Sequence, residues 1–343
     1  MKDRLSYIDQ LKGIAIFLVV FGHSIQNNTV ESDKQPLFVW LYSFHMPLFM
    51  FISGYIAGKS THINSLSDYG IFLKKRVISL LIPYFVWPLL VHNFFFKKND
   101  TLDFATQGWK LITQWNSLWY LWFLFFLLIC YSLFYIASRK LNKKNIILID
   151  VIIASSIAAL LYVIKPLGLF ISSSSFLLYF LFLFSGVFAY KYSIISNVLL
   201  NQWIFSISLL LFIVLSGRYD YNDNGNLNKL LKIIIAFSAI SSLYYIVRKI
   251  KWNPTVDKYV QLLGRNTIVI YTTHFAINWF FKGVPLFSNL GLVSLILVNF
   301  VLALIVIIAC LLIFEIVQLS PLLNFLLYGH MPKASRKPVP DHN

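Results

Sequence analysis

One stretch near the start of the chain reads Ile8-Asp9-Gln10-Leu11-Lys12-Gly13-Ile14-Ala15-Ile16-Phe17-Leu18-Val19-Val20-Phe21-Gly22-His23. It places a lysine at the entrance of an apolar run and a histidine inside that run. On an α-helix, Lys12 and His23 project from one face about 16 Å apart. An ionisable side chain at bilayer depth costs at least about 2.5 kcal/mol when charged, so such residues usually face a bundle interior and have a function. The stretch therefore predicts a membrane helix with a polar site.

The composition supports this prediction, because 58% of the residues are hydrophobic and 12% are charged, whereas a soluble protein carries about a quarter charged residues. It indicates an all-α, polytopic membrane helical bundle. Ten apolar runs are long enough to cross a hydrocarbon core of roughly 30 Å. They lie near 13–30, 36–58, 77–96, 117–138, 146–164, 175–191, 201–216, 229–247, 264–282 and 290–316.

We expect one transmembrane domain over residues 1–320 and a cytoplasmic tail over 321–343. With ten spans both termini share a side, and twenty of the 29 lysines and arginines lie in the loops on that side. The positive-inside rule then predicts that both termini are cytoplasmic. The net charge is +16, but the lysines and arginines cluster at the ends of the predicted helices, where they fix topology. No nucleic-acid partner is therefore expected. Cys130 and Cys310 lie inside apolar runs, so we expect neither a disulfide nor a metal site.

Three histidines lie inside the predicted spans. With this orientation His23, His45 and His274 all fall near the midplane, and they would share one polar cavity if their helices adjoin. The alternative for each is a histidine that only forms a hydrogen bond between helices.

The stretch from Ser43 to Tyr55 contains a proline in the middle of a predicted span. Pro47 predicts a kink beside His45, and Ser53 with Gly54 predicts a close helix approach. Such a helix lines a cavity, or it is bent for packing alone.

Two further stretches place cations next to apolar runs. Lys74-Lys75-Arg76 precedes the run that contains Pro83-Tyr84, and three adjacent cations suit an anionic donor bearing phosphates. The alternative is a cluster that only fixes topology. Arg265 and Asn266 begin a stretch in which Thr267, Tyr271 and His274 form one polar stripe, which lines a cavity or holds helices together.

Other classes of protein find less support. Gly54-Tyr55-Ile56-Ala57-Gly58-Lys59-Ser60 has three residues between its glycines where a phosphate-binding loop has four. Acidic residues inside the predicted spans are scarce, with Glu315 almost alone, which weakens a proton-coupled transporter. No internal repeat is visible, although a transporter or flippase for a polysaccharide intermediate remains the alternative function. A non-catalytic scaffold would leave the histidines unexplained.

Taken together, these stretches resemble acyltransferase family 3, and within it the fucose 4-O-acetylase-like branch. The resemblance covers the whole chain and rests on Tyr7-Ile8-Asp9 through His23, Phe44-His45-Met46-Pro47 through Ser53-Gly54-Tyr55, Arg76 through Pro83-Tyr84, Leu118-Trp119-Tyr120-Leu121-Trp122-Phe123-Leu124, and Gly264 through His274. Two positions depart from the family pattern. Lys12 stands for an arginine, and Ser79 stands where a second arginine follows Arg76.

The resemblance implies an integral membrane O-acetyltransferase of the bacterial cytoplasmic (inner) membrane. It would move an acetyl or other acyl group from cytoplasmic acyl-CoA to a hydroxyl of a cell-surface polysaccharide or lipid-linked glycan. Acetyl-CoA would be a substrate rather than a bound cofactor, and the partners would be the lipid bilayer, the glycan acceptor and polysaccharide-assembly proteins. His23 would act as a general base or carry the acetyl group, and either role needs a neutral imidazole.

We assign the remaining roles as follows: catalysis to His23, Lys12 and Asp9; donor binding to Arg76, Lys75 and Arg265; acceptor binding to His45, Ser53, Tyr84, Asn266, Tyr271 and His274.

Overall fold

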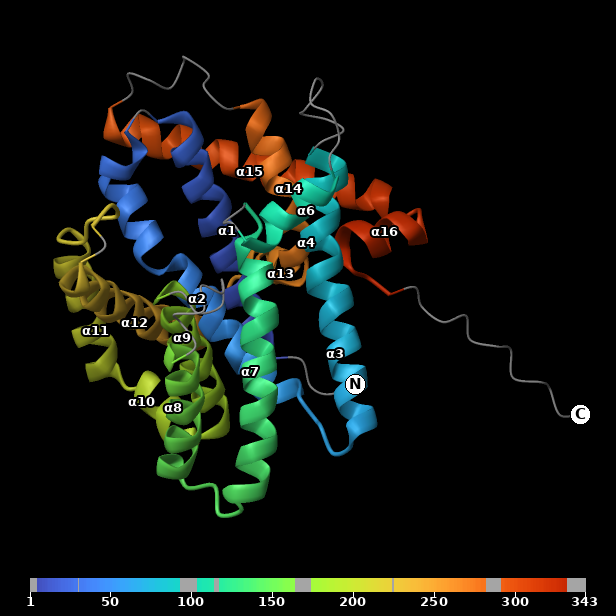
Figure 1. Ribbon diagram of the computed structural model, residues 1–343. Coiled ribbons are helices and arrows are strands. Elements are labelled where there is room, and N and C mark those ends of the chain that lie inside the picture. The colour runs from blue at the N-terminus through green and yellow to red at the C-terminus, as the bar shows by residue number, and fades with distance from the viewer. Residues whose placement is uncertain are drawn as a thin grey trace, which may run out of the picture.

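The computed structural model describes residues 5–29, 31–92, 104–113, 117–163, 174–223, 225–281 and 291–331. Every regular element in these ranges is helical, which confirms the all-α prediction (Figure 1). The elements are α1 (Ser6–Asn28), α2 (Pro36–Ser60), α3 (Leu66–Arg76), α4 (Ile82–Val86), α6 (Phe104–Thr113), α7 (Trp119–Leu141), α8 (Ile147–Val163), α9 (Ser174–Lys191), α10 (Ser193–Leu199), α11 (Gln202–Ser216), α12 (Asn226–Lys249), α13 (Pro254–Arg265), α14 (Thr267–Phe280), α15 (Leu292–Val317) and α16 (Pro321–Tyr328), with a 3-10 turn at Ser32–Lys34 and π-helical turns at Val77–Leu81 and Trp87–His92.

Five helices among the described residues are long and apolar enough to cross a membrane, namely α1, α2, α7, α12 and residues 293–317 of α15. The pair α9 and α10, bent by 106°, forms a sixth candidate, and α8 and α11 are shorter apolar helices. The protein is therefore a multi-pass membrane protein. The count of ten spans and the cytoplasmic side of the termini stay predictions.

Helix α2 packs closely against α9, as Figure 1 shows. A Cβ atom added at Gly54 would overlap the carbonyl oxygen of Leu183, and one at Gly186 would overlap that of Phe51. Two glycines therefore let the two backbones touch, and the close approach predicted at Gly54 is confirmed. The helix continues through Pro47 as one element.

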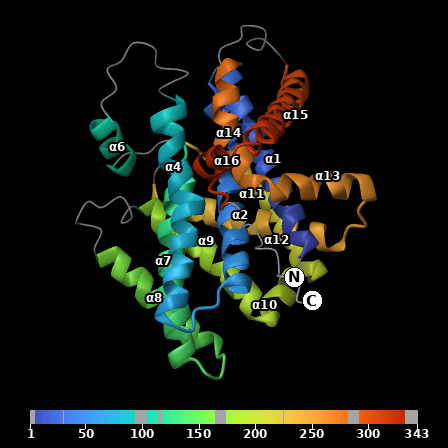
Figure 2. The same cartoon turned by 90° about the vertical axis from the view of Figure 1, so that its right-hand side faces the viewer.

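Helix α13 lies crosswise over the first half of α1 (Figure 2). A Cβ atom at Gly264 would overlap the carbonyl oxygen of Asp9, so α13 also meets α1 backbone to backbone. The Gln10 amide donates to a carboxylate oxygen of Asp257 over 2.7 Å, and Gln261 donates to the same oxygen over 2.8 Å. These hydrogen bonds hold the pKa of Asp257 below its usual value.

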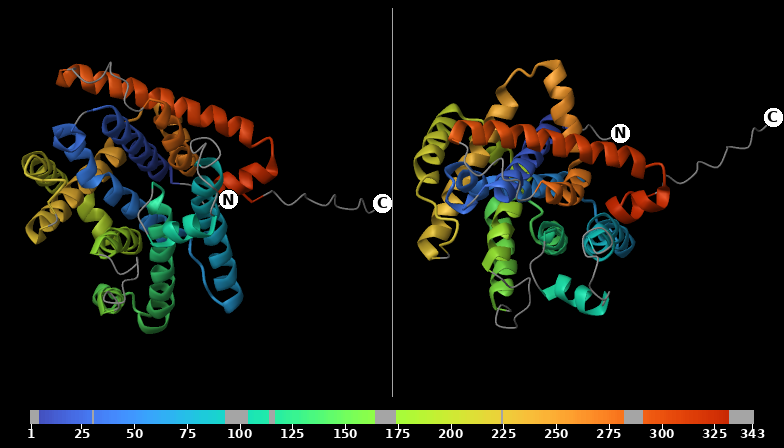
Figure 3. Two further views of the ribbon diagram at one scale, coloured as in Figure 1. Left: turned by 45° about the horizontal axis from the view of Figure 1, so that its top comes forward. Right: turned by 90° about the horizontal axis from the view of Figure 1, so that it is seen from above.

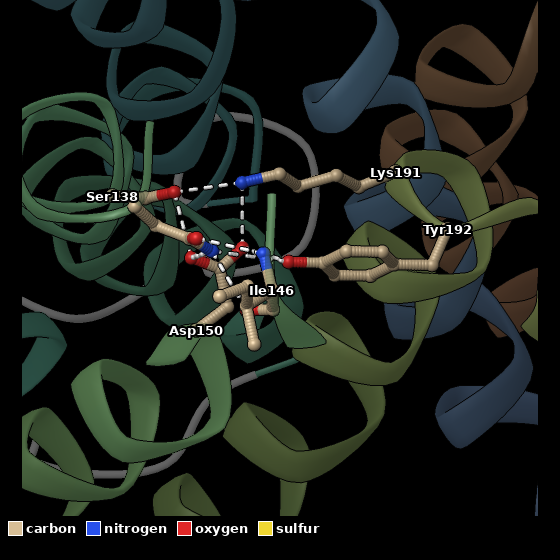
Figure 4. A network of polar contacts seen from close by, with 6 residues as sticks. Ser138, Ile146, Asp150, Lys191 and Tyr192 are labelled. Atoms are coloured by element: carbon tan, nitrogen blue, oxygen red, sulfur yellow. Dashed lines mark hydrogen bonds and ion pairs between the residues drawn. The ribbon is translucent and has the colours of Figure 1, made fainter. Parts of the chain in front are cut away.

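A buried carboxylate joins α7, α8 and α9 (Figure 4). Asp150 is fully buried, and its oxygens lie 2.6 Å from the Lys191 ammonium, 2.7 Å from the Tyr192 hydroxyl and 2.8 Å from the Ser138 hydroxyl. The Asn142 amide donates to it as well. Asp150 is thus a second acidic residue inside the predicted spans besides Glu315, which is consistent with the prediction that such residues are scarce. Its hydrogen bonds indicate a structural role.

The last helices close the bundle on one side. Helix α15 runs across α1 and α14, and the chain then turns back into α16 (Figure 3). The indole nitrogen of Trp87 donates to the carbonyl of Leu327 over 2.8 Å, and the hydroxyls of Tyr328 and Thr273 lie 3.1 Å apart. Part of the predicted tail is thus packed into the protein, whereas residues 332–343 lie outside the described ranges.

Candidate functional site

The helix arrangement brings the three predicted histidines to one end of the bundle, which we call the His23 end. The ring centres of His23 on α1 and His274 on α14 lie 5.4 Å apart. Tyr42 on α2 connects His23 to His45. Its hydroxyl is 3.0 Å from Nδ1 of His23, and its ring centre is 4.7 Å from that of His45. We call His23, Tyr42, His45 and His274 the histidine cluster.

His23 lies in the second half of α1, which begins at Ser6, before the apolar run that starts near residue 13. Helices α13 and α2 pack against α1. His23 is about one and a half turns from the end of the helix at Asn28, and its depth in the bilayer stays a prediction.

Hydrogen bonds define which ring nitrogens carry protons. Nδ1 of His45 lies 2.6 Å from the carbonyl oxygen of Leu41, and Nδ1 of His274 lies 2.9 Å from that of Ile270. A carbonyl oxygen only accepts, so in both rings the proton is on Nδ1 and a neutral ring keeps a lone pair on Nε2. His23 follows the same pattern, since its Nδ1 lies 2.8 Å from the amide oxygen of Gln26.

Buried polar atoms without partners accumulate next to these rings. Within the described residues, Nε2 of His274 and both side-chain polar atoms of Asn278 have no hydrogen-bond partner, although both side chains are buried. Asn278 follows His274 by one helical turn, so the two project from the same face of α14. Buried polar groups are nearly always paired, and such atoms are where a polar substrate or water would bind. Asn278 was missed because an asparagine near a helix end is common.

A chain of aromatic contacts leads inward from the histidine cluster. The ring centres of Tyr271 and His274 are 5.9 Å apart, and those of Tyr271 and Tyr120 are 5.5 Å apart. The Tyr120 hydroxyl lies 2.8 Å from that of Ser53. The structure thus joins the predicted acceptor residues His45, Ser53, Tyr271 and His274 into one connected wall.

The hydrogen bonds of Tyr84 and Asn266 go to other parts of the chain. The Tyr84 hydroxyl donates to the carbonyl of Leu111 over 2.5 Å, and its ring stacks on Trp122 with centres 5.1 Å apart. The amide of Asn266, which stands between α13 and α14, donates to the carbonyl of Leu262 in α13. Tyr84 also lies near enough to Tyr271 to interact with it electrostatically, whereas the Asn266 hydrogen bond is local.

A second cluster occupies the opposite end of the bundle, which we call the Tyr7 end. The hydroxyls of Tyr7 and Tyr55 lie 2.6 Å apart, and the Tyr244 ring centre is 6.1 Å from that of Tyr7. The Arg248 guanidinium carbon lies 4.3 Å from the Tyr7 ring centre, a cation–π arrangement. We call these four residues the Tyr7 cluster. Tyr244 and Arg248 were missed, because an arginine at a helix end is typical of a topology signal.

The predicted cations lie at this same end. The Lys12 ammonium is 3.9 Å from Asp9, and Asp9 contacts Gly264 beside the exposed Arg265. The structure does not bring Lys12 and Asp9 to His23, from which Lys12 is separated by about 16 Å of helix. Their assignment to catalysis stays a prediction.

Arg76 and Lys75 differ in their surroundings. Lys75 is exposed, whereas Arg76 is half-buried at the start of the π-helical turn, with its guanidinium carbon 5.2 Å from the Phe72 ring centre. Its Nε has no hydrogen-bond partner among the described residues. Arg76 also interacts electrostatically with Tyr131 on α7. Of the two, Arg76 is the cation available to an anion from inside the bundle.

In the described part of the chain no three histidine, cysteine, aspartate or glutamate residues lie close enough together to hold a metal ion. The site geometry accordingly consists of imidazoles, hydroxyls, amides and two guanidinium groups. It suits proton transfer at one end and anion binding at the other.

Comparison with known proteins bears on this chemistry. A family model described as an acyltransferase domain matches residues 5–315. A protein named Nodulation protein NolL from Sinorhizobium fredii is 34% identical over 127 residues, which is 33% of this chain and 32% of that protein. Its namesake from Mesorhizobium japonicum is 26% identical over 297 residues, which is 78% of this chain and 75% of that protein. The chain thus matches about a third of the first relative and three quarters of the second. No solved structure matches.

Proposed function

The chain belongs to the acyltransferase 3 family of membrane enzymes, and on that premise we propose that it is an O-acetyltransferase of the bacterial cytoplasmic membrane. In this proposal it moves the acetyl group of cytoplasmic acetyl-CoA to a hydroxyl of a surface polysaccharide or a lipid-linked glycan. The observation that carries the proposal is the His23 ring, with Nδ1 hydrogen-bonded and Nε2 left as a base beside a second imidazole.

The chemical step follows from that ring. Nε2 of His23 takes the proton of the acceptor hydroxyl, and the oxygen attacks the carbonyl carbon of the thioester. The carbon–sulfur bond then breaks, and the leaving thiolate takes the proton back from the imidazolium. The products are the O-acetyl ester and free CoA, and His23 returns to its starting state.

The unpartnered amide of Asn278 is suited to the charge that develops in this step. Addition to the thioester places negative charge on the carbonyl oxygen, and a preorganised N–H donor stabilises it. A carboxamide with both polar atoms buried and unpaired supplies such a donor without breaking an existing hydrogen bond.

The donor would enter from the Tyr7 end. Tyr7 and His23 are separated by about 24 Å of helix, so one donor must be elongated to reach both ends. Acetyl-CoA has this form, with phosphates at one end and the thioester at the other. Arg248 and Arg76 are the cations suited to its phosphates, since guanidinium groups bind phosphate in a bidentate manner.

The test is CoA release by purified protein in liposomes, measured as free thiol. Wild-type protein given acetyl-CoA and lipid-linked glycan is expected to release thiol and to form an equal amount of acetylated glycan. A transporter of the glycan intermediate would move the acceptor without releasing thiol. Thiol release that is independent of the acceptor would point to hydrolysis and would contradict the proposed transfer.

A further inference from the structure

A pocket of about 610 Å³ lies next to the histidine cluster, and nothing above assigns it a ligand. Residues from the start of α9, the α11–α12 connection and the start of α12 line it, and its Tyr221 ring packs on Phe38 and Tyr42 in the first turns of α2. Its lining combines apolar, aromatic, amide and charged side chains: Ser175, Leu177, Leu178, Leu181, Tyr219, Tyr221, Asn222, Asp223, Asn228, Lys229, Lys232 and Ile233. We call it the loop pocket.

The loop pocket contains a cation that lacks a counter-ion. The Lys232 ammonium, on the half-buried side chain of an α12 residue, lies 5.6 Å from the centre of the Tyr219 ring. Among the described residues it has no ion pair and no hydrogen-bond acceptor. Charged groups that are withdrawn from water are normally paired, so an unpaired ammonium facing a pocket is a binding position for an anion.

The wall around Lys232 is held by specific hydrogen bonds. The Asn228 amide donates to the carbonyl oxygens of Asp220 and Asp223 over 2.6 and 2.7 Å, which fixes the α11–α12 connection. The Asn222 amide donates to the carboxylate of Asp33 over 2.7 Å, which ties the connection to the turn before α2. The pocket is therefore pre-formed, as small-molecule sites usually are.

The loop pocket adjoins the histidine cluster through an aromatic contact. Tyr221 lines the pocket, and its ring centre lies 5.5 Å from that of Tyr42, whose hydroxyl reaches His23. Lys232 also lies near enough to His45 to interact with it electrostatically. A ligand in the loop pocket therefore lies beside the histidine cluster, on the side of Tyr42.

We propose that the loop pocket binds a glycan acceptor that carries a negatively charged group, a carboxylate or a phosphate, with Lys232 as the partner of that charge. The rings of Tyr219 and Tyr221 offer amphipathic faces to the adjoining sugar ring. The assignment rests on the proposed glycan acceptor and makes it more specific, because a neutral glycan would leave Lys232 unpaired.

The test measures binding in detergent by isothermal titration, with no donor present. The probes are a uronic-acid-containing oligosaccharide, the same oligosaccharide with its carboxyl groups reduced to alcohols, and polyprenyl diphosphate. Wild-type protein is expected to bind at least one anionic probe about tenfold or more tightly than the reduced oligosaccharide, as a charge-assisted hydrogen bond provides. Tighter binding of the oligosaccharide would mean that the anionic group that pairs with Lys232 is carried by a sugar. Tighter binding of polyprenyl diphosphate would mean that it is carried by the lipid carrier.

Three variants test whether Lys232 is the residue that binds the anionic group. Lys232→Met is expected to remove the preference and Lys232→Arg to keep it, while Lys249→Met, at the exposed far end of the same helix, leaves binding unchanged. Because Lys232→Met removes an unpaired charge, its melting temperature should not fall; if it does fall, Lys232→Gln is used in its place. Equal wild-type affinity for charged and neutral probes, or an equal loss for both in Lys232→Met, would overturn the assignment. Discrimination in binding together with no acetyl transfer would instead contradict the proposed function alone.

Discussion

The hydroxyl oxygen of Tyr42 lies 3.0 Å from Nδ1 of His23. Both groups also contact the amide oxygen of Gln26, each over 2.8 Å. The contact joins α2 to α1 and holds the His23 ring from one side. The nitrogen on the other side of the ring, Nε2, is left to react.

Tyr42→Phe should slow the chemical step, because it removes this hydroxyl and keeps the ring that packs on Phe38. One hydrogen bond contributes about 1 kcal/mol net, so we expect kcat to fall about fivefold to tenfold. KM for the acceptor should change less than twofold. The measurement is steady-state CoA release, and an increased KM with an unchanged kcat would contradict a role for Tyr42 in orienting His23.

Asn278→Leu tests the proposed donor to the developing charge. Loss of one such donor costs about 10²-fold in kcat. The conservative variant Asn278→Gln should keep part of the wild-type kcat, because it retains a carboxamide. An Asn278→Leu variant with wild-type kcat would show that the unpaired amide does not take part.

Arg248→Gln should weaken the binding of acetyl-CoA. Its guanidinium lies over the Tyr7 ring, where it is available to phosphate, so we expect KM for acetyl-CoA to rise about tenfold while kcat changes little. The control is Lys249→Gln, which changes an exposed cation next to it in the sequence. If both variants raised KM equally, general loss of positive charge would explain the effect.

Asp150→Asn should destabilise the bundle without changing the chemistry. Removal of one partner from a buried ion pair leaves Lys191 uncompensated and costs about 3–5 kcal/mol. Thermal unfolding in detergent should therefore show a lower melting temperature. The double variant Asp150→Asn/Lys191→Met should recover part of the loss, and a double variant less stable than Asp150→Asn would contradict the pairing.

Gly54→Ala should disturb the contact between α2 and α9, because its methyl group would overlap a backbone carbonyl that cannot move aside alone. Overpacking of this kind costs about 1–3 kcal/mol. Gly70→Ala in α3 is the matched control, since nothing lies within 4 Å of its added methyl group. It should raise stability slightly, because alanine favours helix. Equal melting temperatures for the two variants would contradict the close packing.

The sequence predicted the helical class, and the family resemblance is confirmed by the match over residues 5–315. Periodicity placed Lys12 and His23 on one face, but it could not show that α13 covers the entrance of α1. Arg248, Asn278 and Lys232 could not be recognised from the sequence, because a polar residue near a helix end has the same pattern whether or not it has a partner. Their surroundings depend on which helices adjoin, and that comes from tertiary packing.

The most direct test of His23 as the base for acetyl transfer uses radiolabelled acetyl-CoA and inverted membrane vesicles. These vesicles expose the cytoplasmic face to the donor, and label is followed into lipid-linked and polymeric glycan. We expect label in glycan with wild-type protein and none above empty vesicles with His23→Ala expressed at the same level. Equal labelling of glycan by wild type and His23→Ala would contradict the central role of His23.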